Sequence, residues 1–185
     1  MRIRLSENDI KSTMDLQNNS CSCLDDAIEK VMCSYQNANK WLDTIKECVL
    51  MDIGCVFFSD YLHNLAHTMP ERFDKFGDIL HTEDMKVPYP TTNEIDEEPT
   101  DITSVFEKVF CILDCIKCSL SEFIDCTEEC GYNSMKISAE GLLEDISTEY
   151  TNLKRMERTY QRVNDEIEFD KWVEQYVNNL DSLLD

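Results

Sequence analysis

The stretch EDMKVPYPTTNEIDEEPT, residues 83–100, decides how this chain folds. It contains three of the four prolines, and the helical rhythm of apolar residues on either side of it is lost within it. Proline lacks the backbone N–H that a helix interior needs, so the stretch predicts a non-helical connection. Extended, it would span more than about 40 Å, roughly the length of a 28-residue helix. A connection of this length favours a crossover between two parallel helices, because antiparallel neighbours need only a short loop.

Two long amphipathic patterns precede this connection. Apolar residues recur at steps of three and four over residues 24–50 and again over residues 55–82, which predicts two helices. Gly54, the first glycine of the chain, predicts a left-handed turn between them. Pro70 lies inside the second pattern, where a kinked helix and a break with a fresh start at Thr68 are both open. The kink is slightly favoured, because the apolar rhythm keeps its phase across the proline.

Two further amphipathic patterns follow the connection. They predict helices at residues 101–130 and 135–164, with Gly131 ending the first and Ser134 capping the second. A shorter amphipathic segment ends the chain. The expected fold is therefore all-α: a four-helix bundle with one long crossover between its second and third helices and a short C-terminal fifth helix.

The domain organisation expected from this pattern is simple. Residues 1–21 are rich in Asn, Ser and Asp and predict a flexible N-terminal tail. Residues 22–185 predict one helical bundle, since 185 residues are enough for a single sizeable core.

Charge and hydropathy limit the classes of function. The chain has 17 basic and 38 acidic residues, for a formal net charge of −21, which disfavours nucleic acid as a partner. An acidic surface attracts cations, including hydrated metal ions, although it also simply keeps a protein soluble. The N-terminus shows no signal-peptide pattern and no run is long enough to span a membrane, so a cytoplasmic protein is expected.

Ten cysteines would indicate a disulfide framework in a short secreted chain, but a reducing cytosol predicts free thiols here. Half of them recur along one predicted helix and are interpreted as small core residues: Cys111, Cys115, Cys118, Cys126 and Cys130. Their spacing does not reproduce a zinc-knuckle or iron–sulfur motif.

All three histidines lie in SDYLHNLAHTMPERFDKFGDILH, residues 59–81. Histidines and carboxylates alternate there at steps of three or four, which places them in one stripe along a helix: Asp60, His63, His67, Glu71, Asp74, Asp78 and His81. The stripe is either a metal site or the solvated face of an acidic helix. A helix of this length extends about 30 Å, so the whole stripe cannot serve one site.

The helix lengths, the central crossover and the fifth helix resemble those of the ferritin-like superfamily. LHNLAHTMPERFDKFGDILH resembles the second-helix region of ferritins and Dps-type mini-ferritins. The resemblance implies a homo-oligomeric iron-binding protein that oxidises Fe(II), a ferroxidase-type activity, and stores or detoxifies iron. The alternative is a ferritin-like bundle without a metal site, serving as a structural or protein-interaction module.

The same resemblance implies two possible iron sites. An intrasubunit site would combine Asp60-x-x-His63, which resembles Glu-x-x-His with Asp in place of Glu, with carboxylates of the other helices. These would be Asp26 or Glu29 on the first helix, Glu107 on the third, and Glu140 and Glu144 on the fourth. A Dps-type site between subunits would instead use His63, His67, Asp74 and Asp78, with His81 as a further candidate. No histidine lies beyond His81, so the full diiron pattern is not reproduced.

Overall fold

A computed structural model describes the backbone of residues 7–94 and 97–181 and the side chains of residues 23–94 and 97–179. The described chain is helical throughout apart from its connections, and it contains no strand, which confirms the all-α prediction. The helices are α1 (Glu7–Cys48), α2 (Val56–His81), α3 (Ile102–Cys130), α4 (Asn133–Val163) and α5 (Glu166–Asp181). None of the described helices is both long and apolar enough to cross a membrane.

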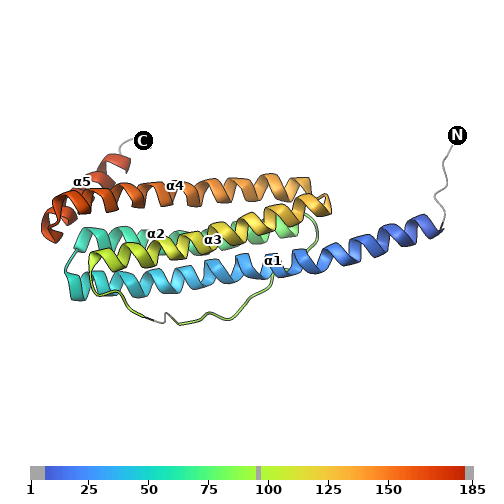
Figure 1. Cartoon of the computed structure of the whole chain (residues 1–185), viewed down its shortest axis with the longest axis horizontal. Helices are drawn as coiled ribbons and strands as arrows, with labels where there is room; N and C mark the ends of the chain where they lie inside the picture. The colour runs from blue at the N-terminus through green and yellow to red at the C-terminus, as the bar shows by residue number, and fades with distance from the viewer. Residues whose placement is uncertain (1–6, 95–96, 182–185) are drawn as a thin grey trace.

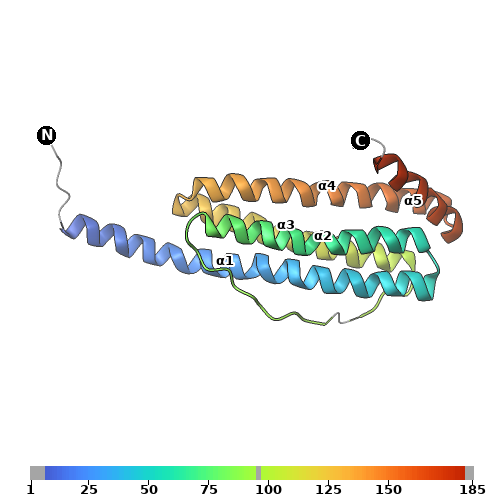
Figure 2. The same cartoon turned by 180° about the vertical axis from the view of Figure 1, so that it is seen from behind.

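The four long helices lie side by side along their lengths (Figures 1 and 2). Helix α1 packs against α2 and α3, and α4 packs against the same two helices, while α5 contacts α2 and α4 at one end. The connection between α2 and α3 runs back along the outside of α1, so α2 and α3 point in the same direction. Helices that follow each other directly, α1 with α2 and α3 with α4, run antiparallel.

Glycine ends two of the helices, as predicted. The last turn of α1 widens into a π-helix, Val49–Ile53, and Gly54 then adopts a φ of 86° and donates its N–H to the Val49 carbonyl at 2.9 Å. Gly131 has a φ of 80° and closes α3. Both conformations are left-handed, where an L side chain is strained, so both positions require glycine.

The starts of α3 and α4 are stabilised in different ways. Asp101 caps α3 in a reciprocal capping box with Ser104. Ser134 does not cap α4, which begins after Tyr132; the Ser134 hydroxyl donates to Glu83 Oε1 at 2.9 Å instead. That contact ties the start of α4 to the connection after α2, a partner that local sequence could not reveal.

Helix α2 is continuous through Pro70, so the less favoured of the two alternatives, a break at Thr68, does not occur. The Thr68 hydroxyl donates to the Leu65 carbonyl within the same helix and caps no new one. Met69 and Phe73 are buried on either side of the proline. Burying one apolar face across Pro70 therefore outweighs the loss of its backbone hydrogen bond.

The N-terminal segment predicted as a flexible tail is helical from Glu7 onward, and its flexibility stays a prediction. Residues 7–21 continue α1, and this part of the helix extends beyond the other helices (Figures 1 and 2). No glycine or proline precedes Gly54, so nothing in the local sequence stops the helix. Residues 1–6 lie outside the described part of the chain.

The crossover is fixed to α1 by two reciprocal hydrogen bonds. The Asn93 N–H donates to Asn37 Oδ1 at 2.8 Å, and the Trp41 indole N–H donates to the Asn93 carbonyl at 3.0 Å. Nearer the start of the crossover, the centroid of the Tyr89 ring lies 5.7 Å from that of the Phe73 ring of α2. Side chains of α1 and α2 thus hold the extended chain along the helices.

The cysteine prediction was only partly correct. Cys126 is buried, as expected of a core residue, and Cys130 is half-buried. Cys111, Cys115 and Cys118 are exposed, so the prediction that they fill the core is wrong. The apolar face of α3 already contains larger side chains that compete for the same interior, and the helix rotates these three thiols toward solvent.

Candidate functional site

The residues predicted for an intrasubunit metal site do not point into one cavity. On α2, Asp60 and His67 are exposed and His63 is half-buried. The carboxylates predicted on the other helices are all exposed: Asp26, Glu29, Glu107, Glu140 and Glu144. Among residues with described side chains, no three His, Cys, Asp or Glu groups gather closely enough to hold a metal ion.

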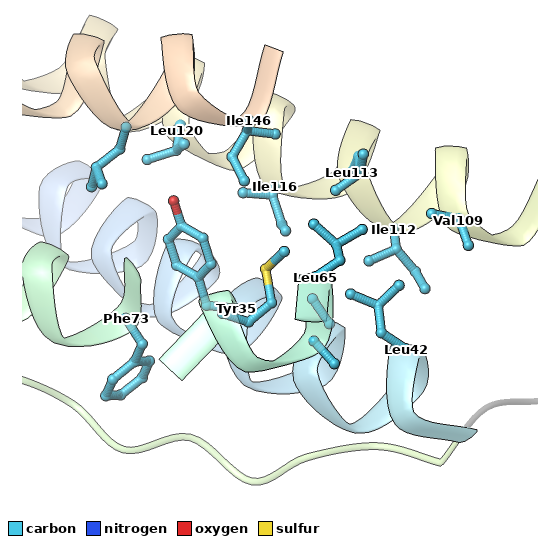
Figure 3. Close-up of a cluster of buried hydrophobic side chains, with 14 of the residues drawn as sticks. Tyr35, Leu42, Leu65, Phe73, Val109, Ile112, Leu113, Ile116, Leu120 and Ile146 are labelled. Atoms are coloured by element: carbon cyan, nitrogen blue, oxygen red, sulfur yellow. The ribbon is translucent and has the colours of Figure 1, made fainter. Parts of the chain in front are cut away.

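Apolar side chains occupy the space where the helices face one another. Figure 3 shows Tyr35 and Leu65 from α1 and α2 opposite Ile116 and Ile146 from α3 and α4. Three of these side chains are completely buried, and Leu65 is nearly so. The Tyr35 hydroxyl points into this cluster and has no hydrogen-bond partner, and burial raises its pKa well above the usual value. None of these four residues offers a carboxylate or an imidazole, so this part of the interior does not fit a diiron site.

The residues predicted for an intersubunit site, His67, Asp74 and Asp78, are exposed on α2, as is His81. The structure holds one chain and shows no partner for them. Metal binding by these residues stays a prediction.

His63 is the predicted ligand with the most specific surroundings. Its Nδ1 lies 3.6 Å from Asp43 Oδ1 on α1, and its ring packs edge-on against His67 with 4.3 Å between centroids. Both facing atoms are buried without a hydrogen bond. Lys46 Nζ lies 3.9 Å from the same Asp43 oxygen and 2.9 Å from Glu47. The same Asp43 oxygen thus faces both a lysine and a histidine.

Asp43 was missed by the sequence analysis, which proposed Asp26 or Glu29 as the α1 partner. A usable signal existed, because Asp43 and His63 lie at nearly equal distances in sequence from the turn at Gly54. Antiparallel helices joined by a short turn bring such positions together. The hydrogen bond from the Ser59 hydroxyl to the Lys46 carbonyl, at 3.1 Å, follows the same register.

The groove beside Asp43 and His63 is open and charged. Its volume is about 830 Å³, and charged side chains that line it include Lys40, Glu47 and Asp52, together with Glu98 from the crossover. Water fills a groove of this kind, so a cation bound there would retain much of its hydration shell.

A second polar cluster lies between α2 and α4 and was not expected from the sequence. Arg72 is only 8% exposed, and its guanidinium donates to Glu149 Oε1 at 3.3 Å and to the Thr68 hydroxyl at 2.8 Å. The Tyr61 hydroxyl donates to Glu149 Oε2 at 3.2 Å. Burial, followed by the nearby Glu149 charge, raises the pKa of Tyr61 well above its usual value. Every charged group of this cluster has a partner, so it is best understood as a structural clamp between the two helices.

No protein-family model matches this chain, and no curated protein is significantly similar to it in sequence. The site is therefore interpreted from its geometry.

Proposed function

We propose that this chain is a four-helix bundle, with the helix order and single crossover of the ferritin-like class, that serves as a protein-interaction module for a basic partner. The apolar interior carries this proposal. An iron-oxidising bundle would need carboxylates in its interior. In this chain the candidate carboxylates lie on the outer faces instead, where their charges are available to a binding partner.

The proposed contact surface is the α2 carboxylate stripe, defined as Asp60, Glu71, Asp74 and Asp78. All four are exposed, and within the described part of the chain none of them has an ion-pair partner. Arg72, on the same helix, forms an ion pair with Glu149 and therefore does not neutralise the four carboxylates of the stripe. The net charge of −21 adds a long-range field of the same sign. Such a surface steers a basic partner and sets the orientation in which it binds.

A matched pair of charge variants tests this surface. The stripe variant carries Asp60→Asn, Glu71→Gln, Asp74→Asn and Asp78→Asn. The control variant neutralises four exposed carboxylates elsewhere: Glu107→Gln, Asp125→Asn, Glu140→Gln and Glu144→Gln. The measurement is fluorescence anisotropy with a labelled lysine-rich helical peptide at physiological ionic strength. We expect the stripe variant to bind about tenfold more weakly and the control to change less than about twofold, because only nearby charges escape screening.

Equal weakening in the two variants would contradict the proposal, since it would show that net charge alone attracts the peptide. Unchanged binding in the stripe variant would contradict it as well. Circular dichroism of both variants checks that neutralising exposed carboxylates has left the helices intact.

The second candidate function is iron binding, and Asp43 with His63 favours it. Asp43 Oδ1 and His63 Nδ1 lie 3.6 Å apart on facing helices, and both are buried without a hydrogen bond. They would supply two of the ligands of a divalent cation. Carboxylate oxygen and imidazole nitrogen are both suitable ligands for iron. Lys46 competes for the same carboxylate, so this pair would hold a cation only weakly. Homo-oligomerisation and a cytoplasmic location also stay predictions of the ferritin resemblance and the sequence.

An anaerobic titration with Fe(II), in which calorimetry measures the affinity, tests this candidate. If iron binds here, we expect one weak site per chain that His63→Ala weakens by about tenfold or more, because the variant removes one of two protein ligands. His81→Ala serves as the control and should leave the affinity unchanged. Equal affinity in wild type and His63→Ala would exclude this site. Exposure to oxygen afterwards should give no ferric absorbance, whereas its appearance would contradict the first proposal.

A further inference from the structure

Two thiols from different helices meet at one end of the seam between α1 and α3. Cys23 Sγ on α1 lies 2.8 Å from Cys126 Sγ on α3. This separation is closer than two non-bonded sulfur atoms normally approach, and only somewhat longer than the roughly 2.05 Å of a disulfide bond. Cys126 is buried, whereas Cys23 is exposed. One sulfur of the pair is therefore open to reagents in solution, and the other is held beneath it.

The pair is part of an ordered register and is not an isolated approach of two side chains. Further along the same seam, Lys30 of α1 pairs with Glu122 of α3. The Ser34 and Ser119 hydroxyls follow at 3.0 Å, both buried. Since α1 and α3 run antiparallel, residue numbers rise on one helix as they fall on the other. The packing of the two helices thus fixes Cys23 opposite Cys126.

We propose that Cys23 and Cys126 form a reversible disulfide that fastens α1 to α3 under oxidising conditions. The oxidant is a small-molecule disulfide such as glutathione disulfide. The Cys23 thiolate attacks one of its sulfur atoms, giving a mixed disulfide and releasing one glutathione thiolate. Cys126 then attacks the Cys23 sulfur and releases the second glutathione as a thiolate, and the protons lost by the two protein thiols pass through solvent to the two released glutathione thiolates. Two protein thiols are oxidised by two electrons, and one glutathione disulfide is reduced to two glutathione thiols.

The surroundings assign the two thiols to these steps. Burial, followed by the hydrogen bond with Cys23, raises the pKa of Cys126 to about 12. Cys126 therefore remains protonated and unreactive toward reagents until a leaving group is placed beside it. Cys23 is exposed and meets the oxidant first. Cys130, one turn beyond Cys126 and half-buried, is the nearest competing thiol on α3.

The bond would join residues 103 positions apart. Closing so long a loop restricts the unfolded chain strongly, so the oxidised protein should melt about 10 °C higher than the reduced one. The link would also anchor α1 beside Leu24, a residue of its buried face. Redox state would thereby control how firmly that part of α1 is held.

Peptide mapping of the full-length protein tests the proposal. The chain is equilibrated in glutathione buffers of increasing oxidised fraction, quenched in acid, alkylated and digested without reduction. We expect a Cys23–Cys126 linked peptide to be the main intramolecular product and to disappear on reduction. The melting temperature should rise with it in wild type and in the control Cys33→Ser, but not in Cys23→Ser or Cys126→Ser.

Alkylation of both thiols in the most oxidising buffer would overturn the proposal. So would a predominant link from either thiol to another cysteine, such as Cys126 to Cys130, or a temperature shift that persists in Cys23→Ser. Mapping the wild-type protein decides the question even if Cys126→Ser fails to fold, because the buried position tolerates change least. The outcome is independent of the proposed partner binding, which uses exposed carboxylates of α2.

Discussion

We expect Asp170→Ala to lower the free energy of unfolding by about 3 kcal/mol, since it removes two charge-assisted hydrogen bonds from a buried site. Asp170 lies on α5 and is 9% exposed. Its carboxylate accepts the N–H groups of Val56 at 2.9 Å and Phe58 at 2.8 Å, the first turn of α2. The N-cap residue of α2, Cys55, provides no side-chain cap of its own. A residue more than 100 positions away therefore caps this helix.

Chemical denaturation at neutral pH measures this effect. Asp170→Asn should lose roughly half as much stability, because its amide oxygen can still accept one of the two N–H groups. Glu168→Ala, an exposed position on the same helix, is the control and should change stability by less than about 0.5 kcal/mol. If Asp170→Ala matched the control, α5 would not be holding the start of α2.

The second large effect is expected at the clamp between α2 and α4. Arg72→Leu should lower the free energy of unfolding by about 3 kcal/mol, because it leaves the Glu149 carboxylate largely buried without its positive partner. The side chains of Arg72 and Glu149 are only 9% and 23% exposed. The Thr68 hydroxyl also loses the hydrogen bond that Arg72 donates to it. Urea denaturation monitored by circular dichroism measures the difference.

A double variant separates the ion pair from general packing. Adding Glu149→Leu to Arg72→Leu removes the orphaned charge, so the pair of changes should cost less than Arg72→Leu alone. Lys75→Leu serves as the control, since Lys75 is exposed on the same helix and has no ion-pair partner in the described chain. An additive double variant would show that Arg72 and Glu149 do not act as a pair.

The apolar positions of the long helices could be predicted residue by residue. The apolar residues that recur at steps of three and four before the crossover form the buried faces of the first two helices, from Leu24 and Ile28 to Phe76 and Leu80. Gly54 and Gly131 were likewise identified as the ends of helices. These features follow from local chemistry: helical periodicity sets which residues share a face, and glycine is the residue that adopts a left-handed backbone without strain.

The candidate site could not be predicted in the same way. A helical stripe shows which histidines and carboxylates share a face, but not whether that face turns inward. Asp60, Glu107 and Glu140 lie on exposed faces because larger apolar side chains compete for the interior and bury more area. Metal binding by His63 stays a prediction, and its neighbour Asp43 depends on the register between α1 and α2.

The sequence by itself therefore determined the presence of the long helices, the glycines that end two of them and the apolar face of each, because those depend on residues within a few positions of one another. Only the tertiary structure decided which polar groups meet. Asp170 caps α2, Arg72 reaches Glu149, and Cys23 lies on Cys126. Each of these contacts joins residues far apart in the chain, and its geometry is set by the rotation and register of packed helices. Those two quantities arise when all the apolar faces are buried together, and no single segment contains them.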